Sequence, residues 1–204
     1  MFTEPRLYQG ERDLAAIYDL LRQGRLADNG TYYVHPGDLS WWLFYPPLEH
    51  DFWQSLYLWD DPQVAARILA WVLLPPNGST LDVALQPELR GSPWHRELFG
   101  WGLNQAMRQA KQAGRERIGA FWICEQDTLL RGWLVEQGFE LASRDAHLAC
   151  DLGLPGQPGP VPGGYVVRSS RGLAEVSPRA RAQYGAFGSQ ANFEPYVQRF
   201  ARFM

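Results

Sequence analysis

Residues 81–91 read LDVALQPELRG, and this stretch decides how the chain folds. The apolar residues from Thr80 to Leu85 predict a strand, and the proline and glycine that follow mark a loop. A helical pattern comes next, from about Pro93 to Ala113, and Ile118 to Cys124 is an apolar run of strand length. A strand–helix–strand crossover makes the second strand parallel to the first. The stretch therefore predicts an α/β domain.

The residues upstream predict one strand, two helices and a hairpin. Asp13 can cap an amphipathic helix that begins directly after it. Asp38 or Ser40 can cap a short helix rich in aromatic residues. The predicted strands are apolar runs bounded by turn residues, and they are Arg6 to Gln9, Gln54 to Trp59 and Val64 to Leu74. Together with residues 80–85, the last two form three sequential antiparallel strands.

The residues downstream of the crossover complete the domain. Asp127 or Thr128 can cap a helix that ends at Gly138. Phe139 to Leu141 and His147 to Leu152 then predict a final hairpin. Residues 1–152 are thus expected to form a mixed, mostly antiparallel sheet of about seven strands flanked by helices.

A composition break separates this domain from the rest of the chain. Residues 153–163 are rich in proline and glycine, which predicts a linker. Residues 164–204 predict a strand over Tyr165 to Arg168 and two helices, which repeats how the first domain begins. Three elements cannot bury their apolar faces alone. This partial unit is therefore expected to pack on the first domain, to pair with another chain or to belong to a longer parent.

Charge and composition exclude several classes of protein. The formal net charge is -3, and no basic run interleaves with aromatic residues, so a nucleic-acid partner is not expected. The longest aliphatic stretch, Ile68 to Leu74, is too short to span a bilayer, and no signal peptide precedes it. We therefore expect a soluble cytoplasmic protein. Cys124 and Cys150 lack metal-ligand spacing and are interpreted as buried, reduced thiols.

This order of elements resembles the GNAT superfamily of acyl-CoA-dependent N-acyltransferases. The likeness rests on residues 35–43 (HPGDLSWWL) with the hairpin after them, on residues 81–91, and on residues 127–139, which end in Gly138-Phe139. It covers about residues 1–152 and is similar to the first domain of bacterial tandem GNAT proteins, with residues 164–204 as an incomplete second domain. The resemblance implies acetyl-CoA as co-substrate and a small-molecule or protein amine as acceptor.

The family holds the pyrophosphate of its co-substrate on backbone N–H groups at a helix N-terminus. Its pattern is Arg/Gln-x-x-Gly-x-Gly/Ala. Arg90 matches, whereas Pro93 and His95 replace the two glycines, and proline contributes no N–H. The loop is either a modified phosphate cradle or a loop that merely starts a helix, with Pro93 near its first position. The resemblance gives these residues for co-substrate binding: Leu85, Gln86, Arg90, Gly91, Ser92, Trp94, His95 and Arg96, of which the first two meet the pantetheine arm.

Acyl transfer also needs groups that move protons. A tyrosine on the last helix of the family often protonates the leaving thiolate, but Leu134 stands at that position and no tyrosine lies between Thr128 and Gln137. Asp82, on the strand before the loop, is the candidate base for the amine. The alternative is that Asp82 is a solvent-facing strand residue or a turn partner.

Two functions from different classes stay open at this point. One is an acetyl-CoA-dependent N-acyltransferase. The other is a catalytically silent GNAT-like domain that binds a ligand or a partner, or forms a homodimer. Five aromatic residues either wall an acceptor pocket or pack in the core: Trp41, Trp42, Trp53, Tyr57 and Trp94.

Overall fold

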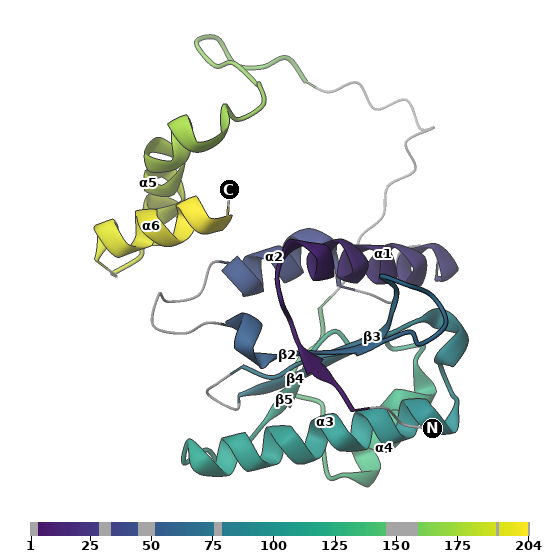
Figure 1. Cartoon of the computed structure of the whole chain (residues 1–204). Helices are drawn as coiled ribbons and strands as arrows, with labels where there is room; N and C mark the ends of the chain where they lie inside the picture. Colours follow the sequence, from purple (N-terminus) through teal and green to yellow (C-terminus); the bar gives the residue numbers. More distant parts are fainter. Residues whose placement is uncertain are drawn as a thin grey trace. The chain divides into compact units, whose positions relative to one another are not determined.

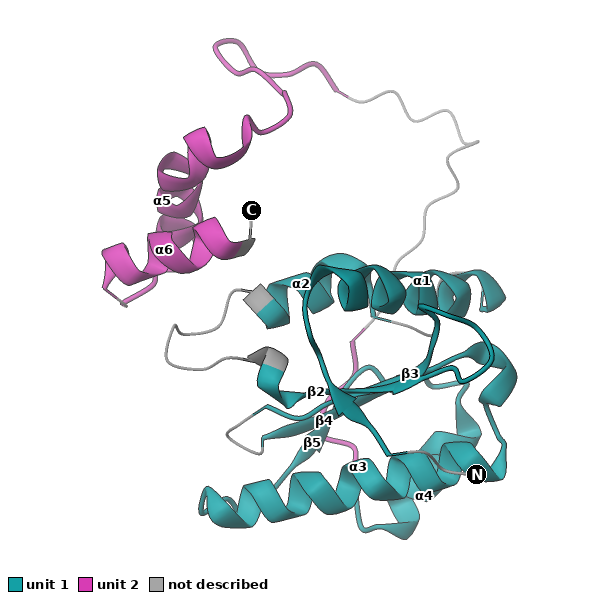
Figure 2. Ribbon diagram, viewed as in Figure 1, with its two compact units in different colours: residues 1–140 teal, residues 141–204 magenta. Residues whose placement is uncertain are grey.

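A computed structural model describes residues 4–28, 34–44, 52–75, 79–145, 159–190 and 192–203. The chain divides into two units, Met1–Glu140 and Leu141–Met204 (Figure 2). Over these described ranges, no helix is long and apolar enough to cross a membrane. The same ranges hold no group of three His, Cys, Asp or Glu side chains that could bind a metal ion.

One five-stranded sheet, ordered β1-β2-β3-β4-β5, organises the first unit. Its first four strands are antiparallel, and β5 is parallel to β4. The strands are β1 (Arg6–Leu7), β2 (Leu56–Asp60), β3 (Ile68–Leu73), β4 (Thr80–Leu85) and β5 (Gly119–Ala120). The central strand β3 is buried along almost its whole length, because helices cover the sheet on both faces.

The helices form one layer on each face of the sheet (Figure 1). α1 (Glu11–Ala27) and α2 (Pro36–Phe44) lie on one face, and α3 (Pro93–Gln112) and α4 (Thr128–Glu136) on the other. Short 3-10 turns, η1 (Phe52–Ser55) and η2 (Pro87–Leu89), precede β2 and α3.

Each face of the sheet has its own hydrophobic cluster. The α1–α2 cluster includes Ile17, Leu39 and Ala84, and the α3–α4 cluster includes Leu81 and Leu98. Burying a leucine or isoleucine side chain stabilises the fold by about 1.5–3 kcal/mol. Gly102 lets α3 approach the sheet closely, because a Cβ atom there would lie 2.9 Å from a side-chain carbon of Leu81.

The second unit contains the 3-10 turn η3 (Gly172–Glu175) and two helices, α5 (Val176–Ala186) and α6 (Phe193–Phe203). The two helices pack through aromatic side chains: the Tyr184 ring meets Phe193 and Tyr196 edge-on, at centroid distances of 5.2 and 5.3 Å. The predicted strand over Tyr165 to Arg168 is wrong, since these residues have no regular secondary structure. A strand needs a neighbouring strand for its backbone hydrogen bonds, and none is present among the described residues of this unit.

The predicted α/β class, the mostly antiparallel sheet and the β4–α3–β5 crossover are confirmed. The sheet has five strands in the described residues, fewer than the seven predicted. The strand predicted over Ile118 to Cys124 is only two residues long, and Phe139 to Leu141 forms no strand. The predicted partner of that last segment, residues 147–152, lies outside the described residues.

Two helix starts also differ from the prediction. α1 begins at Glu11, after Gly10, so Asp13 lies inside its first turn and accepts a hydrogen bond from the Gln9 N–H at 2.6 Å. Asp13 is held there by Arg6, whose guanidinium donates to both of its carboxylate oxygens at 2.7 Å. α2 begins at Pro36, which places the predicted caps Asp38 and Ser40 within the helix.

Candidate active site

A gap opens between β4 and β5, and it forms the candidate active site. The two strands pair at only two positions, Thr80 with Gly119 and Leu81 with Ala120. β4 continues to Leu85, whereas β5 ends at Ala120. Two residues further on, Trp122 adopts a left-handed backbone conformation with φ 59°, which a bulky residue rarely takes.

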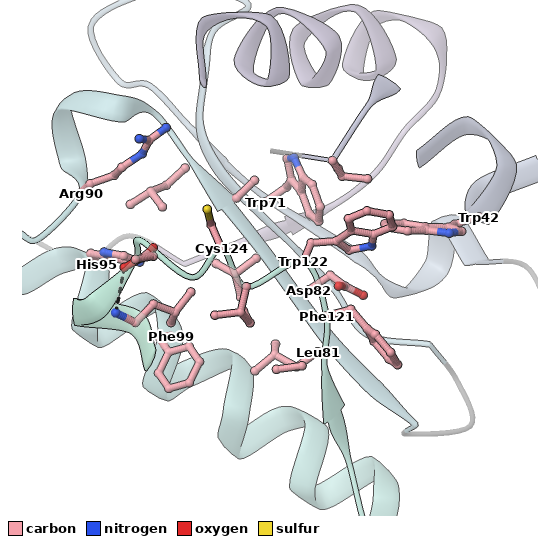
Figure 3. A pocket seen from close by; sticks show the side chains of 18 residues that line it. Trp42, Trp71, Leu81, Asp82, Arg90, His95, Phe99, Phe121, Trp122 and Cys124 are labelled. Atoms are coloured by element: carbon pink, nitrogen blue, oxygen red, sulfur yellow. Dashed lines mark hydrogen bonds between the residues drawn. The ribbon is translucent and has the colours of Figure 1, made fainter. Parts of the chain in front are cut away.

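A pocket occupies this gap (Figure 3). Its walls are residues 81–85 of β4, residues 120–124 after the crossover, and side chains from α2, α3 and α4. Figure 3 shows Arg90 and His95 at one end of the pocket and Asp82 with Trp42 at the other. The same pocket therefore joins the N-terminus of α3 to the α2 face of the sheet.

Backbone groups of β4 point into the gap at alternate residues. Gly119 N–H donates to Ser79 O at 2.8 Å on the β5 side, whereas Gln86 N–H donates to Leu69 O at 2.8 Å on the β3 side. Successive residues of a strand point their N–H and C=O groups to opposite neighbouring strands. The backbone groups of Val83 and Leu85 therefore point to the same side as those of Ser79, which is toward the gap. Gln86 is turned to β3, and its side-chain amide donates to Ile68 O at 2.9 Å. Val83 was not among the residues that the sequence suggested.

Asp82 is the buried carboxylate of this pocket. Only 8% of the residue is exposed, and its Oδ1 has no hydrogen-bond partner among the described residues. Burial raises the pKa of Asp82 to about 7, and a hydrogen bond with Thr80 opposes that rise. The alternative of a solvent-facing strand residue is therefore wrong. Asp82 shares a face of β4 with Ala84, which packs in the α1–α2 cluster.

Hydrogen bonds within residues 89–95 engage several backbone N–H groups at the N-terminus of α3. Ser92 is the N-cap: its Oγ accepts from the His95 N–H at 3.2 Å and donates to Leu89 O at 2.6 Å. Gly91 N–H donates to His95 Nδ1 at 3.2 Å, and Ser92 N–H donates to Leu89 O at 3.2 Å. Pro93 has no N–H to offer. The N–H groups of Gly91, Ser92 and His95 are thus bonded within the loop instead of being directed at a ligand.

The cationic side chains of the loop also have partners in the protein. Arg90 Nη1 donates to Asp28 Oδ1 at 2.6 Å, at the end of α1. Arg96 Nη2 donates to Glu136 Oε2 at 2.7 Å. Burial lowers the pKa of His95, which fits a neutral ring that accepts through Nδ1.

The aromatic residues divide between the pocket and the core. Trp42 lines the pocket and meets Trp122 at a centroid distance of 5.8 Å. Trp94 packs edge-on against Trp59 at 6.4 Å, and Tyr57 packs edge-on against Trp101 at 5.1 Å. Trp41 is not among the lining residues, and the side chain of Trp53 lies outside the described residues. No sequence signal marks Trp122, because a positive φ cannot be read from a tryptophan within an apolar run.

Two further predictions concern Leu134 and Cys124. Leu134 is buried in the α3–α4 cluster, and no tyrosine stands among the described residues that line the pocket. Cys124 lines the pocket and is only partly buried, which differs from the buried thiol that the sequence predicts. Its thiol donates to Gln126 Oε1 at 2.6 Å. Cys150 lies outside the described residues.

Comparisons with known proteins find only distant structural similarity. No family model matches the chain, and no curated protein matches it. A crystal structure assigned as a phosphinothricin N-acetyltransferase matches with 21% identity over 66% of this chain and 79% of that chain, at a TM-score of 0.41. An acetyltransferase of Trypanosoma brucei matches with 14% identity over 72% of this chain and 100% of that chain, at a TM-score of 0.38. At these values the likeness carries no argument.

Proposed function

We propose that the first unit is an N-acyltransferase that moves an acetyl group from acetyl-CoA to an amine. The observation that carries this proposal is the buried Asp82 carboxylate beside the β4–β5 gap. A base is most effective when its pKa lies near the working pH, and burial gives Asp82 a pKa of about 7. A perturbed carboxylate in a pocket is a feature typical of active sites.

The gap suits the acyl donor. Val83 turns its backbone groups toward it, and a pantetheine arm contains amides that can pair with such groups. The donor's thioester then lies in the same pocket as Asp82 and the acceptor amine. Arg90 and His95 lie at the other end of that pocket. We expect the nucleotide part of the donor to leave the pocket at that end.

The reaction then needs two proton movements. Asp82 takes one proton from the amine, and the amine nitrogen attacks the thioester carbonyl carbon. The C–S bond breaks and the thiolate leaves. With Leu134 in place of a tyrosine, the thiolate takes its proton from protonated Asp82 or from water.

A second candidate function is a catalytically silent domain that binds a ligand or partner. The observation in its favour is the N-terminus of α3, where Gly91, Ser92 and His95 bond their N–H groups within the loop. An active enzyme must release some of these groups to hold a pyrophosphate, and this lowers its affinity for acetyl-CoA.

Calorimetric titration with acetyl-CoA, together with a product assay by mass spectrometry, separates the two candidates. Desulfo-CoA serves as the control for thiol artefacts. Binding accompanied by an N-acetylated amine, with product lost in Asp82→Asn, supports the acyltransferase. Binding without product supports the silent domain. No binding at millimolar acetyl-CoA contradicts the use of this co-substrate by the first unit.

A further inference from the structure

An ion pair engages the arginine that lines the pocket. Among the described residues of the pocket wall, Arg90 is the one arginine and no lysine stands with it. Figure 3 shows Arg90 at the same end of the pocket as His95. Its Nη1 donates to Asp28 Oδ1 at 2.6 Å, and the two side chains are only 22% and 12% exposed. A carboxylate of the protein therefore already balances the positive charge at this end of the pocket.

Asp28 lies where its own helix disfavours a negative charge. It is the C-cap of α1, and the carbonyl groups at a helix C-terminus repel an anion. Arg25, in the last turn of the same helix, has the charge that is favoured there. The stability of α1 therefore does not explain a carboxylate at residue 28. The printed contact of that carboxylate is with Arg90, which is 62 positions away in the sequence.

The loop before α3 also has contacts that do not involve Asp28. Arg67, directly before β3, forms an ion pair with Glu88 of η2. Leu89 packs against the α3–α4 cluster. Because these contacts hold residues 88 and 89, we expect the loop to keep its place when the pair between Arg90 and Asp28 is broken.

The other titratable groups at this end of the pocket do not supply a positive charge. Burial lowers the pKa of His95, and its Nδ1 accepts from the Gly91 N–H, so the ring is neutral. Asp127 adds a carboxylate to the pocket wall. A ligand phosphate at this end therefore depends on Arg90 for its opposite charge.

We propose that Asp28 is an autoinhibitory residue, whose carboxylate holds Arg90 in place of a ligand phosphate. The inference rests on the proposed function, since it concerns how the same pocket takes up the pyrophosphate of acetyl-CoA. A phosphate that binds Arg90 must displace the Asp28 carboxylate or share the guanidinium with it. The apparent affinity is then reduced to the fraction of the protein in which Arg90 is available. Acetyl-CoA therefore binds more weakly than it would without the carboxylate.

Calorimetric titration of the full chain carrying Asp28→Asn tests the inference. Asparagine removes the charge, keeps the size of the side chain and is tolerated at the end of a helix. We expect the variant to bind acetyl-CoA and ADP about tenfold more tightly than the wild type does. Acetyl-pantetheine, which lacks the pyrophosphate, is expected to bind both proteins equally. Asp28→Ser, which also lacks the charge, is measured beside it and decides the matter if the asparagine variant does not fold.

Two further variants separate this contact from a general effect of charge. Asp19→Asn makes the same change of charge on α1, at an exposed residue that pairs with Arg22 at 2.8 Å, and we expect it to leave the affinities unchanged. In a protein that also carries Arg90→Gln, Asp28→Asn is expected to give no gain, because the gain depends on the freed guanidinium. Circular dichroism of each variant confirms that it folds.

A folded Asp28→Asn variant whose affinity for ADP and acetyl-CoA is unchanged or weaker overturns the inference. An equal gain for acetyl-pantetheine, or an equal gain in Asp19→Asn, overturns it as well. Failure of the proposed function is seen separately, in the product assay. A wild type that acetylates an amine, beside an Asp28→Asn variant without any gain, leaves the proposed function standing and removes only the inference. A variant that gains affinity for ADP, in a protein that makes no product, removes only the proposed function.

Discussion

The Asp82 carboxyl is buried on β4 with one oxygen unbonded, so its ionisation costs the folded protein free energy. Resemblance to a family singled out Asp82 from the sequence, because a carboxylate stands on the strand before the loop. The sequence could not predict its burial or its raised pKa. Both depend on α2 and on the segment around Trp122, which are far from Asp82 along the chain.

Asp82→Asn is expected to make the protein more stable at about pH 8. The folded-state pKa of about 7 lies above the unfolded value of about 3.9, so the stability that the protonated carboxyl contributes is full below pH 3.9 and is lost as the pH rises through 7. At about 1.4 kcal/mol per pKa unit, the variant gains on the order of 2–4 kcal/mol above that range. Urea unfolding at about pH 4 and pH 8 measures the difference. A variant no more stable than the wild type at the higher pH would show that Asp82 is not desolvated.

The rate of acyl transfer is expected to follow the ionisation of Asp82. kcat/KM should rise with pH and level off above about pH 7, because only the carboxylate accepts a proton. His95 does not share this limb, since burial lowers its pKa. A pH series with the wild type and Asp82→Asn checks the assignment. The same limb in both proteins would place the titrating group elsewhere.

At the scale of elements, the proposed function makes the N-terminus of α3 the part that limits the affinity for acetyl-CoA. His95→Ala removes the acceptor of Gly91 N–H and leaves that donor able to bond a pyrophosphate oxygen. We expect the variant to bind acetyl-CoA more tightly and to lose about 1–3 kcal/mol of stability, because His95 packs on Trp133 at 4.8 Å. Calorimetry measures the affinity. Acetyl-pantetheine, which lacks the pyrophosphate, is the control, and an equal gain for both ligands would contradict this role of the loop.

Local sequence signals predicted the helix boundaries that depend only on neighbouring residues. The start of α3 at Pro93 and the cap of α4 at Asp127 follow from residues next to each other in the chain. The end of β5 at Ala120 does not follow from such a signal, because the apolar run continues to Cys124 in the sequence. The segment Tyr165 to Arg168 has strand propensity but no strand to pair with among the described residues of its unit.

The same distinction applies to the residues of the candidate site. Resemblance placed Arg90 in a phosphate loop, but its ion pair joins it to Asp28, which is 62 positions away in the sequence. Val83 carried no signal, because its place at the gap depends on where β5 leaves the sheet. Pairing over such sequence distances cannot be read from local patterns.

At the scale of the whole molecule, the chain divides after Glu140, whereas the composition break begins at residue 153. The second unit holds Tyr165, Val166 and Val167 with at least 75% of each residue exposed. An exposed apolar run of this kind favours self-association. We expect dimers that form with increasing concentration in sedimentation experiments, and we expect Val166→Lys with Val167→Lys to prevent them. A wild-type monomer at every concentration would contradict the prediction.

The central claim is that Asp82 accepts the proton of an amine while acetyl-CoA donates its acetyl group. Single-turnover reactions of the wild type and Asp82→Asn with acetyl-CoA and benzylamine test it most directly, with N-acetylbenzylamine measured by mass spectrometry at about pH 8. The claim predicts product with the wild type and a rate about 100-fold lower in the variant. Equal rates in the two proteins, or no product although both substrates bind, would contradict it.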